Sequence, residues 1–190
     1  MTPEGTGNRE QGTDTASAFP IPDSRFPIPA IRVGIGYDSH RFAPGGPMIL
    51  GGCTIPSDVS LVAHSDGDAI AHALTDAILG AAGAGDIGEM FADSDERNRG
   101  RSSIEMLRLA VQRVHGLGLI VNNVDVTVIA ERPKIGAHRA AMRAAVAAAL
   151  GIDVDAVSVK GKTNEGMGWI GRAEGLACMA IASLAPASGR

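Results

Sequence analysis

The stretch of residues 64–88 constrains the fold of this chain more than any other. It reads HSDGDAIAHALTDAILGAAGAGDIG, so a polar segment precedes a segment with regularly spaced apolar residues. Apolar residues then recur at the spacing of one helix face, at Ile70, Leu74, Ala77, Ile78 and Ala81. This spacing predicts a helix that buries its apolar stripe in the core. Asp68, His72 and Asp76 step by four along the other side, so we expect all three to face away from the core.

A second polar cluster lies upstream, in the segment RVGIGYDSH. Val33 and Ile35 alternate as in a strand, and Asp38 and His40 follow two residues apart, on one face. If this strand lies beside the helix start, Asp38, His40 and His72 converge on one point. Two imidazoles and a carboxylate suit a borderline divalent ion such as zinc, and three protein ligands leave a tetrahedral position open for water or substrate.

Each of these residues also has a plainer interpretation. Asp68 is then a helix acid stabilised by the helix dipole, and the histidines form a solvated polar face. However, three of the five histidines fall between positions 40 and 72 among acidic residues, which favours a metal site. Asp76, one turn beyond His72, is a candidate acceptor for the proton on the other ring nitrogen.

The composition excludes several classes of protein. A length of 190 residues suits one domain, and aromatic residues at 3% leave the packing to Ala, Val, Ile, Leu and Met. The net charge of -4 argues against a nucleic acid partner but permits a local basic pocket. Cys53 and Cys178 form no CxxC motif, which favours free thiols in a reducing cytoplasm. No apolar run approaches the roughly 18 residues of a membrane span.

The order of the expected elements predicts an α+β fold with helices over one face of a mixed sheet. Residues 1–30 are expected to be a disordered arm, 31–185 the folded domain and 186–190 a tail. The first expected elements are a strand over 31–37, a hairpin that turns at Gly51 and Gly52, and a helix over 70–81. A polar loop follows, and then a helix that starts with a capping box at Ser102 and Glu105 and ends at Gly116. The last expected elements are a strand over 124–129, a helix over 142–150, a strand from Val157 and a strand over 176–184. The other sheet face needs a cover, either a second copy of the chain or a thick layer of polar loops.

The three lysines, Lys134, Lys160 and Lys162, all lie at the ends of late strands beside glycine-rich turns. Such positions suit phosphate oxygens, although lysines at strand ends are as often simply solvated. Thr163 and Glu165 add hard oxygen ligands, and one carboxylate plus substrate phosphates is the usual way to hold Mg²⁺. Farther on, Arg172 and Glu174 fit a structural ion pair equally well.

The motifs DSH, HSDGDAIAH, GDIG, a PK turn and TNEGMGWIGRAEG occur in this order. Over roughly 31–185 the chain therefore resembles the 2-C-methyl-D-erythritol 2,4-cyclodiphosphate synthase family of non-mevalonate isoprenoid biosynthesis. The resemblance implies a homotrimer of ferredoxin-like subunits packed through their sheets, with active sites at the subunit boundaries. It also implies a cytidine diphosphate substrate, 4-diphosphocytidyl-2-C-methyl-D-erythritol 2-phosphate, which is cyclised with release of CMP and without a protein nucleophile.

The resemblance assigns roles to particular residues. Zinc or another divalent cation would bind Asp38, His40 and His72, and Mg²⁺ or Mn²⁺ would bridge the substrate phosphates near Glu165. The catalytic residues would be His64, Thr163 and Glu165. The implied substrate-binding residues are Asp38, His40, His64, Ser65, Asp86, Ile87, Gly88, Phe91, Asp93, Ala130, Pro133, Lys134, Ile135, Lys162, Thr163, Asn164, Glu165, Trp169 and Arg172.

These substrate-binding residues fall into groups. His64 and Ser65 match a loop over the 2-phosphate. The methylerythritol portion is matched by Asp86, Gly88, Phe91 and Asp93, and the cytidine pocket of the adjacent subunit by Ala130, Pro133, Lys134 and Ile135. Arg172 and Glu174 match residues along the trimer axis.

The chain departs from the family pattern at a few pocket positions. Lys162 replaces a frequent threonine, Trp169 replaces a usual phenylalanine, and Ile135 with Gly136 replaces larger residues. Two other functions fit the same residues. One is a metal-dependent phosphodiesterase with water at the open metal position, and the other is a non-catalytic trimeric module that binds a nucleotide or isoprenoid.

Overall fold

The computed structural model describes residues 31–92 and 94–187. The predicted arm 1–30, the predicted site residue Asp93 and residues 188–190 of the predicted tail lie outside the described residues.

A five-stranded sheet has the order β4-β1-β7-β5-β6. Only β5 and β6 pair in parallel, so the sheet is mixed. Its strands are β1 (Arg32–Pro44), β4 (Val59–Leu61), β5 (Leu119–Ile129), β6 (Val157–Lys162) and β7 (Gly175–Pro186). A separate hairpin contains β2 (Met48–Leu50) and β3 (Cys53–Ile55), and it turns at Gly51 and Gly52 as predicted.

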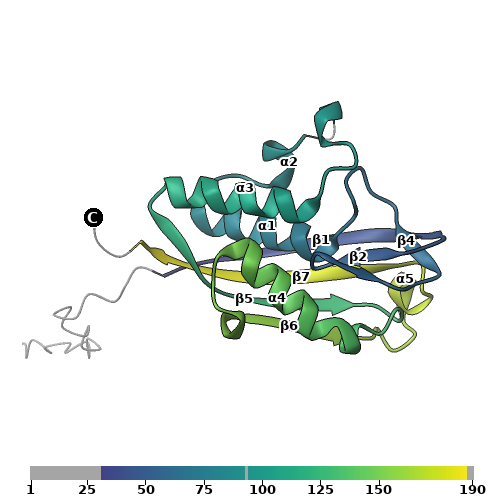
Figure 1. Cartoon of the computed structure of the whole chain (residues 1–190). Coiled ribbons are helices and arrows are strands. Elements are labelled where there is room, and N and C mark those ends of the chain that lie inside the picture. The colour runs from purple at the N-terminus through teal and green to yellow at the C-terminus, as the bar shows by residue number, and fades with distance from the viewer. Residues whose placement is uncertain (1–30, 93, 188–190) are drawn as a thin grey trace, which may run out of the picture.

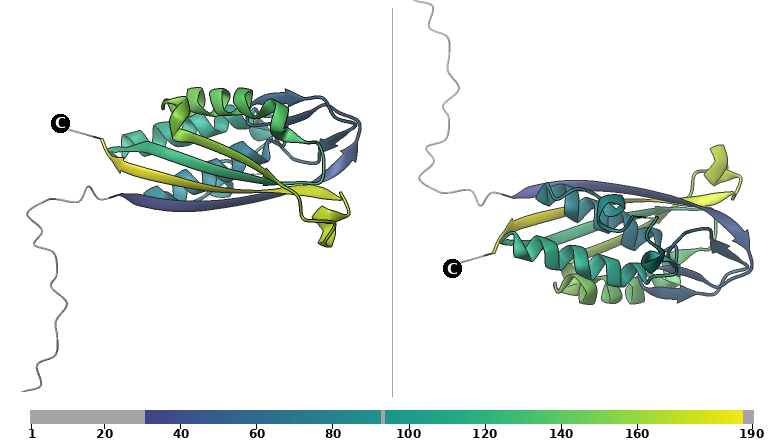
Figure 2. Two further views of the ribbon diagram at one scale, coloured as in Figure 1. Left: turned by 90° about the horizontal axis from the view of Figure 1, so that it is seen from below. Right: turned by 90° about the horizontal axis from the view of Figure 1, so that it is seen from above.

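Three long helices lie on one side of the sheet (Figures 1 and 2). They are α1 (Ala69–Ala82), α3 (Ser103–Gly116) and α4 (Arg139–Leu150). The short helices are α2 (Ile87–Met90), α5 (Gly168–Gly171) and the 3-10 turns Glu96–Asn98, Ile135–His138 and Val154–Ala156. The predicted α+β fold is therefore confirmed. None of the described helices is long and apolar enough to cross a membrane.

Two glycines of β1 bring α1 unusually close to the sheet. A Cβ at Gly34 would lie 2.1 Å from the carbonyl oxygen of Ala77, and a Cβ at Gly36 would lie 1.9 Å from that of Ala73. Only glycine permits this approach, because any side chain would collide with the helix backbone. Asp38 and His40 continue the same strand face, so they point toward the start of α1.

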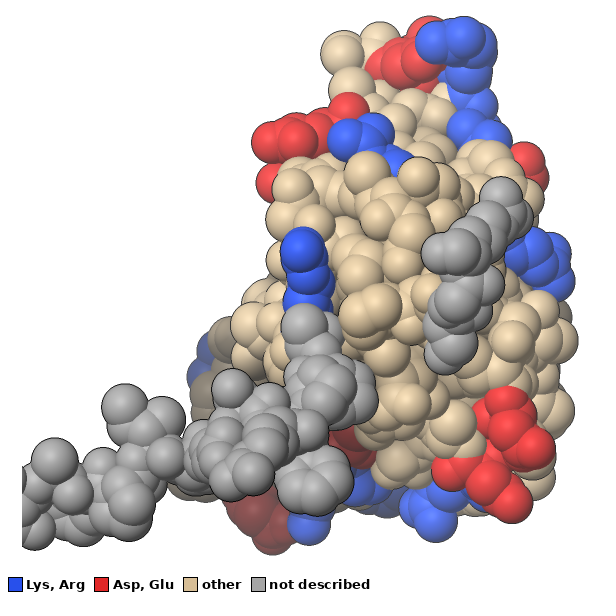
Figure 3. Space-filling model, turned by 90° about the vertical axis from the view of Figure 1, so that its left-hand side faces the viewer, with Lys and Arg blue, Asp and Glu red and all other residues tan. Residues whose placement is uncertain are grey.

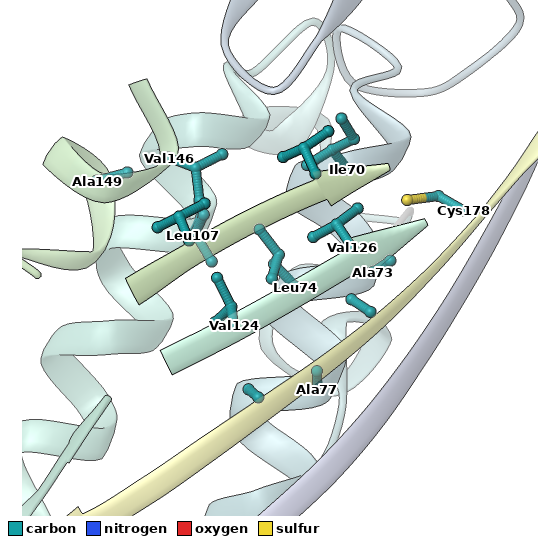
Figure 4. Packing of buried hydrophobic residues seen from close by; sticks show 14 of the residues in the cluster. Ile70, Ala73, Leu74, Ala77, Leu107, Val124, Val126, Val146, Ala149 and Cys178 are labelled. Atoms are coloured by element: carbon teal, nitrogen blue, oxygen red, sulfur yellow. The ribbon is translucent and has the colours of Figure 1, made fainter. Parts of the chain in front are cut away.

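The core between the sheet and the helices is aliphatic. Figure 4 shows Val124 and Val126 of β5 packed with Leu74, Leu107 and Val146 of the three long helices, and none of these side chains is more than 1% exposed. Burying each one stabilises the fold by about 1.5–3 kcal/mol. The helical stripe in the sequence was thus a correct prediction of the buried face of α1.

Several boundaries differ from the sequence prediction. The first strand extends to Pro44 because Phe42 to Pro44 pair with β4, whose three residues are too few to show an alternating pattern. The capping box was wrong: Ser102 caps α3 without a side-chain hydrogen bond, and Glu105 pairs instead with Arg101 at 3.1 Å. The expected polar loop after α1 contains α2 and a 3-10 turn.

Asp68 is the N-cap of α1 and is fully buried, so the prediction that it faces away from the core was wrong. Its carboxylate accepts hydrogen bonds from the amides of Ile70 and Ala71 at 3.1 and 3.2 Å, and from those of Gly51 and Gly52 at 2.7 and 2.6 Å. Burial raises the pKa of Asp68, while the hydrogen bonds from the amides of Gly52, Gly51 and Ala71 oppose the rise. Asp68 therefore joins the hairpin turn to the helix start.

The sheet face opposite the helices is apolar and exposed. Val33, Ile35 and Tyr37 of β1 are 65%, 64% and 54% exposed, and Met179 and Ile181 of β7 are 41% and 47% exposed. Ile35 pairs with Ile181 and Tyr37 with Met179, so the five side chains form a continuous patch, here called the open face. A patch of this kind is a typical contact surface for another protein.

Charged side chains are mixed on the surface. At the end of the molecule drawn in Figure 3, lysines and arginines are interspersed with acidic residues around an uncharged area. The described residues visible on this face form no continuous basic patch of the kind that binds nucleic acid backbones.

Candidate metal centre and active site

The three predicted metal ligands converge where β1 meets the start of α1. Asp38 Oδ2 lies 2.8 Å from His40 Nε2 and 3.3 Å from His72 Nδ1, and the two ring nitrogens are 3.2 Å apart. One ligand atom from each residue lies within 4.8 Å of the others. The prediction that these three residues meet at one point is confirmed.

The donor set fits a cation. The other ring nitrogen of His40, Nδ1, lies 3.1 Å from the carbonyl oxygen of Val62. A carbonyl oxygen only accepts hydrogen bonds, so Nδ1 carries the proton and the neutral ring directs the lone pair of Nε2 at Asp38. With His72 Nδ1 beside them, the three atoms form a cluster of acceptors that a divalent ion would satisfy.

The pKa values at this cluster follow from the same contacts. Burial alone would raise the pKa of Asp38. When no cation is bound and the rings are protonated, hydrogen bonds and charge from His40 and His72 outweigh burial and hold this pKa well below its usual range. Burial would lower the pKa of His40, whereas Asp38 and the Val62 carbonyl raise it, and the net shift is upward. Asp38 is therefore ionised and ready to bind a cation at neutral pH.

The predicted partner of the other His72 nitrogen was wrong. Asp76 Oδ1 accepts a hydrogen bond from the amide of Ile87 at 2.8 Å and thereby holds the start of α2. His72 Nε2 instead lies 2.9 Å from both Ser65 Oγ and Ser103 Oγ. A spacing of four residues places Asp76 on the same helix face as His72, but the neighbouring segment determines its partner.

A cavity of about 220 Å³ opens beside the metal ligands. Besides the metal ligands Asp38 and His40, five residues predicted to bind substrate line it: His64, Ser65, Ile87, Gly88 and Phe91. The Nε2 atom of His64 is buried without a hydrogen-bond partner among the described residues, so it is available to a ligand. Asp86, which was placed in the same group, caps α2 through the amide of Glu89 at 2.8 Å and does not line this cavity.

A second cavity of about 270 Å³ lies at the ends of β5 and β6. Its lining includes all four residues of the predicted cytidine pocket, together with two other predicted residues: Ala130, Pro133, Lys134, Ile135, Lys162 and Thr163. The sheet register places both cavities at the same end of the sheet, since His40 pairs with Leu176 and Ile129 with Ala177. The two cavities share no lining residue.

The turn after β6 presents Glu165. Thr163 Oγ1 donates to Glu165 Oε1 at 2.6 Å, and Glu165 itself has a left-handed backbone with φ of 50°. Glu131 supports this conformation, because its Oε1 accepts hydrogen bonds from the amides of Asn164 at 2.9 Å and Gly166 at 3.3 Å. The carboxylate of Glu165 is exposed and free to bind a cation beside Thr163.

Residues 31–185 match the profile of the YgbB family. The chain belongs to the YgbB family. It is 63% identical over 154 residues to the 2-C-methyl-D-erythritol 2,4-cyclodiphosphate synthase of Gemmatimonas aurantiaca, covering 81% of this chain and 93% of that protein. The resemblance inferred from the motifs is confirmed.

Solved structures agree with this YgbB assignment. A 2C-methyl-D-erythritol-2,4-cyclodiphosphate synthase in a CDP-bound form is 40% identical, with a TM-score of 0.75 over 80% of this chain and 99% of that one. The bifunctional IspDF of Campylobacter jejuni is 42% identical, with a TM-score of 0.80 over 82% of this chain. The match spans 42% of that longer bifunctional chain.

Among the described residues predicted to bind substrate, five line neither of these cavities: Asp86, Asn164, Glu165, Trp169 and Arg172. Trp169 is 37% exposed on α5, and Arg172 pairs with Glu174 at 2.7 Å. This ion pair was one of the two interpretations of Arg172, and the role of Arg172 at a trimer axis stays a prediction. Asn164 is held by Glu131 and donates from its side chain to the carbonyl of Met167 at 2.7 Å.

Sequence reasoning missed Ser103 and Glu131. Ser103 follows the residue expected to cap α3, and its inward direction depends on α3 starting beside α1. Glu131 follows β5 without any motif, and its partners lie 33 and 35 residues further along the chain. Neither residue had a local signal, because both act through contacts between distant segments.

Proposed function

We propose that this YgbB-family chain converts 4-diphosphocytidyl-2-C-methyl-D-erythritol 2-phosphate to 2-C-methyl-D-erythritol 2,4-cyclodiphosphate and CMP. It would act as a phosphorus–oxygen lyase in non-mevalonate isoprenoid biosynthesis. The observation that carries the proposal is the convergence of Asp38, His40 and His72 on one wall of a cavity, in a chain 63% identical to a protein of that name.

The reaction requires the protein to hold the two reacting phosphates of the substrate together, and it requires no protein nucleophile. An oxygen of the 2-phosphate attacks the β-phosphorus, and the bond from that phosphorus to the oxygen shared with the α-phosphate breaks. CMP leaves with the electron pair, and the new bond closes the ring. Holding the two ends of one substrate together is worth up to about 7–11 kcal/mol in favourable cases.

Two groups of residues would form two separate cation sites. Asp38, His40 and His72 would hold Zn²⁺, and Glu165 beside Thr163 would hold Mg²⁺ or Mn²⁺. When bound, these ions polarise the β-phosphate and offset the charge on the departing CMP. His64, with its unpartnered Nε2, would donate a hydrogen bond to the phosphate that faces it.

The remaining predicted residues would fix the ends of the substrate. Ser65 would bind the 2-phosphate, and Asp86, Ile87, Gly88, Phe91 and Asp93 the methylerythritol portion. The second cavity, with Lys134 and Lys162, would take the cytidine end. That a relative binds CDP supports a cytidine nucleotide as part of the substrate. Asn164, Trp169 and Arg172 would complete the wall from the segment after β6.

A homotrimer of ferredoxin-like subunits explains two features together. Packing three sheets around an axis would cover the open face, whose apolar side chains are 41% to 65% exposed in one chain. It would also complete each active site at a subunit boundary, because the metal cavity and the cytidine cavity share no lining residue within one chain. The domain would be 31–185, and the free thiols of Cys53 and Cys178 support a location in the cytoplasm.

Phosphorus NMR of the product tests this function. The purified chain with Zn²⁺ and Mg²⁺ should convert the substrate to CMP and a cyclic diphosphate. A hydrolase would instead give methylerythritol 2,4-bisphosphate with CMP. A binding module would release no CMP at all, so either of these outcomes would contradict the proposal.

A further inference from the structure

Two serine hydroxyls lie behind the ring of His72, on the side away from Asp38. His72 Nε2 is 2.9 Å from Ser65 Oγ and 2.9 Å from Ser103 Oγ. Ser103 is the first residue of α3 and is fully buried. Its amide donates to Asp66 Oδ2 at 3.1 Å, and its hydroxyl donates to Asp66 Oδ1. Ser103 therefore connects a carboxylate to a ring nitrogen.

The number of available protons fixes which atom donates in each hydrogen bond between Asp66, Ser103 and His72. An ionised carboxylate only accepts, so the single hydroxyl proton of Ser103 is used toward Asp66. Toward His72, Ser103 Oγ then has only lone pairs to offer, and His72 Nε2 must carry the proton. The neutral ring of His72 consequently has its lone pair on Nδ1, the atom that lies 3.3 Å from Asp38 Oδ2.

Ser103 is held more firmly than Ser65. Asp66 accepts from both the amide and the hydroxyl of Ser103, and the amide of Asp66 donates to the carbonyl of Arg101 at 3.1 Å. Ser65 has only long contacts besides His72, with Ser103 Oγ and the amide of Gly67, both at 3.3 Å. Ser65 can therefore turn toward a phosphate while Ser103 stays in place.

We propose that Asp66 and Ser103 are positioning residues for the metal centre. They fix the tautomer and the orientation of His72, as the Val62 carbonyl does for His40. This inference rests on the metal site of the proposed function. Groups that orient a metal-binding histidine in this way typically contribute 10–100-fold to metal affinity or activity.

Zinc affinity, measured by competition with a chelator, tests the inference. Ser103→Ala should bind Zn²⁺ about 10–100-fold more weakly than the unaltered chain. Ser102→Ala is the matched control, because Ser102 is the exposed neighbour and makes no capping hydrogen bond with its side chain. The Ser103→Ala enzyme should also need a correspondingly higher free zinc concentration for half-maximal activity, and excess zinc should restore its turnover. The circular dichroism of zinc-free Ser103→Ala should match that of the unaltered chain, because zinc would also rescue a variant that was merely unfolded.

Asp66→Asn provides a second variant if Ser103→Ala does not fold. The side-chain amide that this substitution introduces can donate to Ser103 Oγ and thereby release the hydroxyl proton toward His72, so this variant should also lose zinc affinity. Wild-type affinity in a folded Ser103→Ala, or in Asp66→Asn, would overturn the inference and leave the metal site itself intact. If the unaltered chain failed to bind Zn²⁺, the metal site of the proposed function would be wrong and the inference with it.

Discussion

Gly36 of β1 lies against Ala73 of α1, so closely that a Cβ on the glycine would be 1.9 Å from the carbonyl oxygen of Ala73. Asp38 lies two residues beyond this contact on the strand, and His72 one residue before it on the helix. The close approach of the two backbones therefore sets the distance between two ligands of the candidate metal centre.

Gly36→Ala should consequently damage both stability and the metal centre. The added methyl group has only helix backbone to displace, and overpacking of this kind costs about 1–3 kcal/mol or more. Urea unfolding and zinc titration would measure the two effects. Gly80→Ala is the control, since Gly80 lies on the exposed side of α1 with no atom within 4 Å of the added Cβ. That change should stabilise α1 by up to about 1 kcal/mol.

His72→Ala should abolish turnover and leave the chain folded. Losing one of three metal ligands removes transition-state stabilisation of several kcal/mol, which corresponds to a rate loss of ~100-fold or more. CMP release and circular dichroism would be measured in parallel. His115→Ala, at the exposed end of α3, should behave as the unaltered chain. Full activity of His72→Ala in excess zinc would exclude the assigned metal site.

The metal-free chain should be most stable in mildly acidic solution. The pKa of Asp38 is lowered by folding, so its contribution is present above the unfolded pKa near 3.8 and is lost as pH falls through the lower folded value. The pKa of His40 is raised, so its contribution is present below the unfolded pKa near 6.5 and is lost as pH rises through the folded value. Unfolding in EDTA across pH 3–8 should show this maximum. Asp38→Asn should flatten it, and an unchanged profile would contradict the assignment.

Glu131→Ala should impair the presentation of Glu165. The amides of Asn164 and Gly166 would lose their acceptor, and one lost hydrogen bond of about 1–1.5 kcal/mol corresponds to about a tenfold effect. We expect a tenfold lower kcat and a higher Mg²⁺ concentration for half-maximal activity. Glu131→Gln keeps an accepting oxygen and should recover most of the loss. Equal defects in both variants would show that the charge of Glu131, rather than its accepting oxygen, is required.

Ile35→Asp should dissociate the proposed trimer and abolish activity. Ile35 is 64% exposed in the single chain and pairs with Ile181 at the centre of the open face. A buried, unpaired carboxylate there is strongly unfavourable. Light scattering would give the mass of each variant. Leu117→Asp, a similar change at a residue 56% exposed beyond the end of α3, should keep the mass of the unaltered chain. A trimeric Ile35→Asp would show that the subunits pack through another surface.

The spacing of residues along the sequence predicted the metal ligands, which come from one strand and one helix, better than it predicted the hydrogen-bond partners of nearby carboxylates. The periods of the two elements placed Asp38 and His40 on one strand face and His72 on the polar side of a helix. Their convergence was predicted on the condition that the strand lies beside the helix start, which the packing of β1 on α1 fulfils. Period could not identify the partners of Asp68 and Asp76. Each carboxylate accepts hydrogen bonds from amides on a different segment, and such partners depend on tertiary packing rather than on local pattern.

The same reasoning applies to β4 and Ser103. A three-residue strand has too few side chains to alternate, so only its pairing with Phe42 to Pro44 reveals it. Ser103 was adjacent to a correctly predicted helix start, but its contact with His72 spans 31 residues of sequence. The fold class was therefore readable from the sequence, whereas the hydrogen bonds that orient the ligands were not.

The hydrogen bonds of the Asp68 carboxylate affect how the hairpin and the start of α1 unfold locally. The carboxylate accepts amide protons from the hairpin turn at Gly51 and Gly52 and from the first turn of α1, and no part of it is exposed. If either segment separated alone, it would leave the Asp68 carboxylate without two of its four amide donors. The hairpin and the beginning of α1 should therefore open as one cooperative unit, with amide protons that exchange with solvent together.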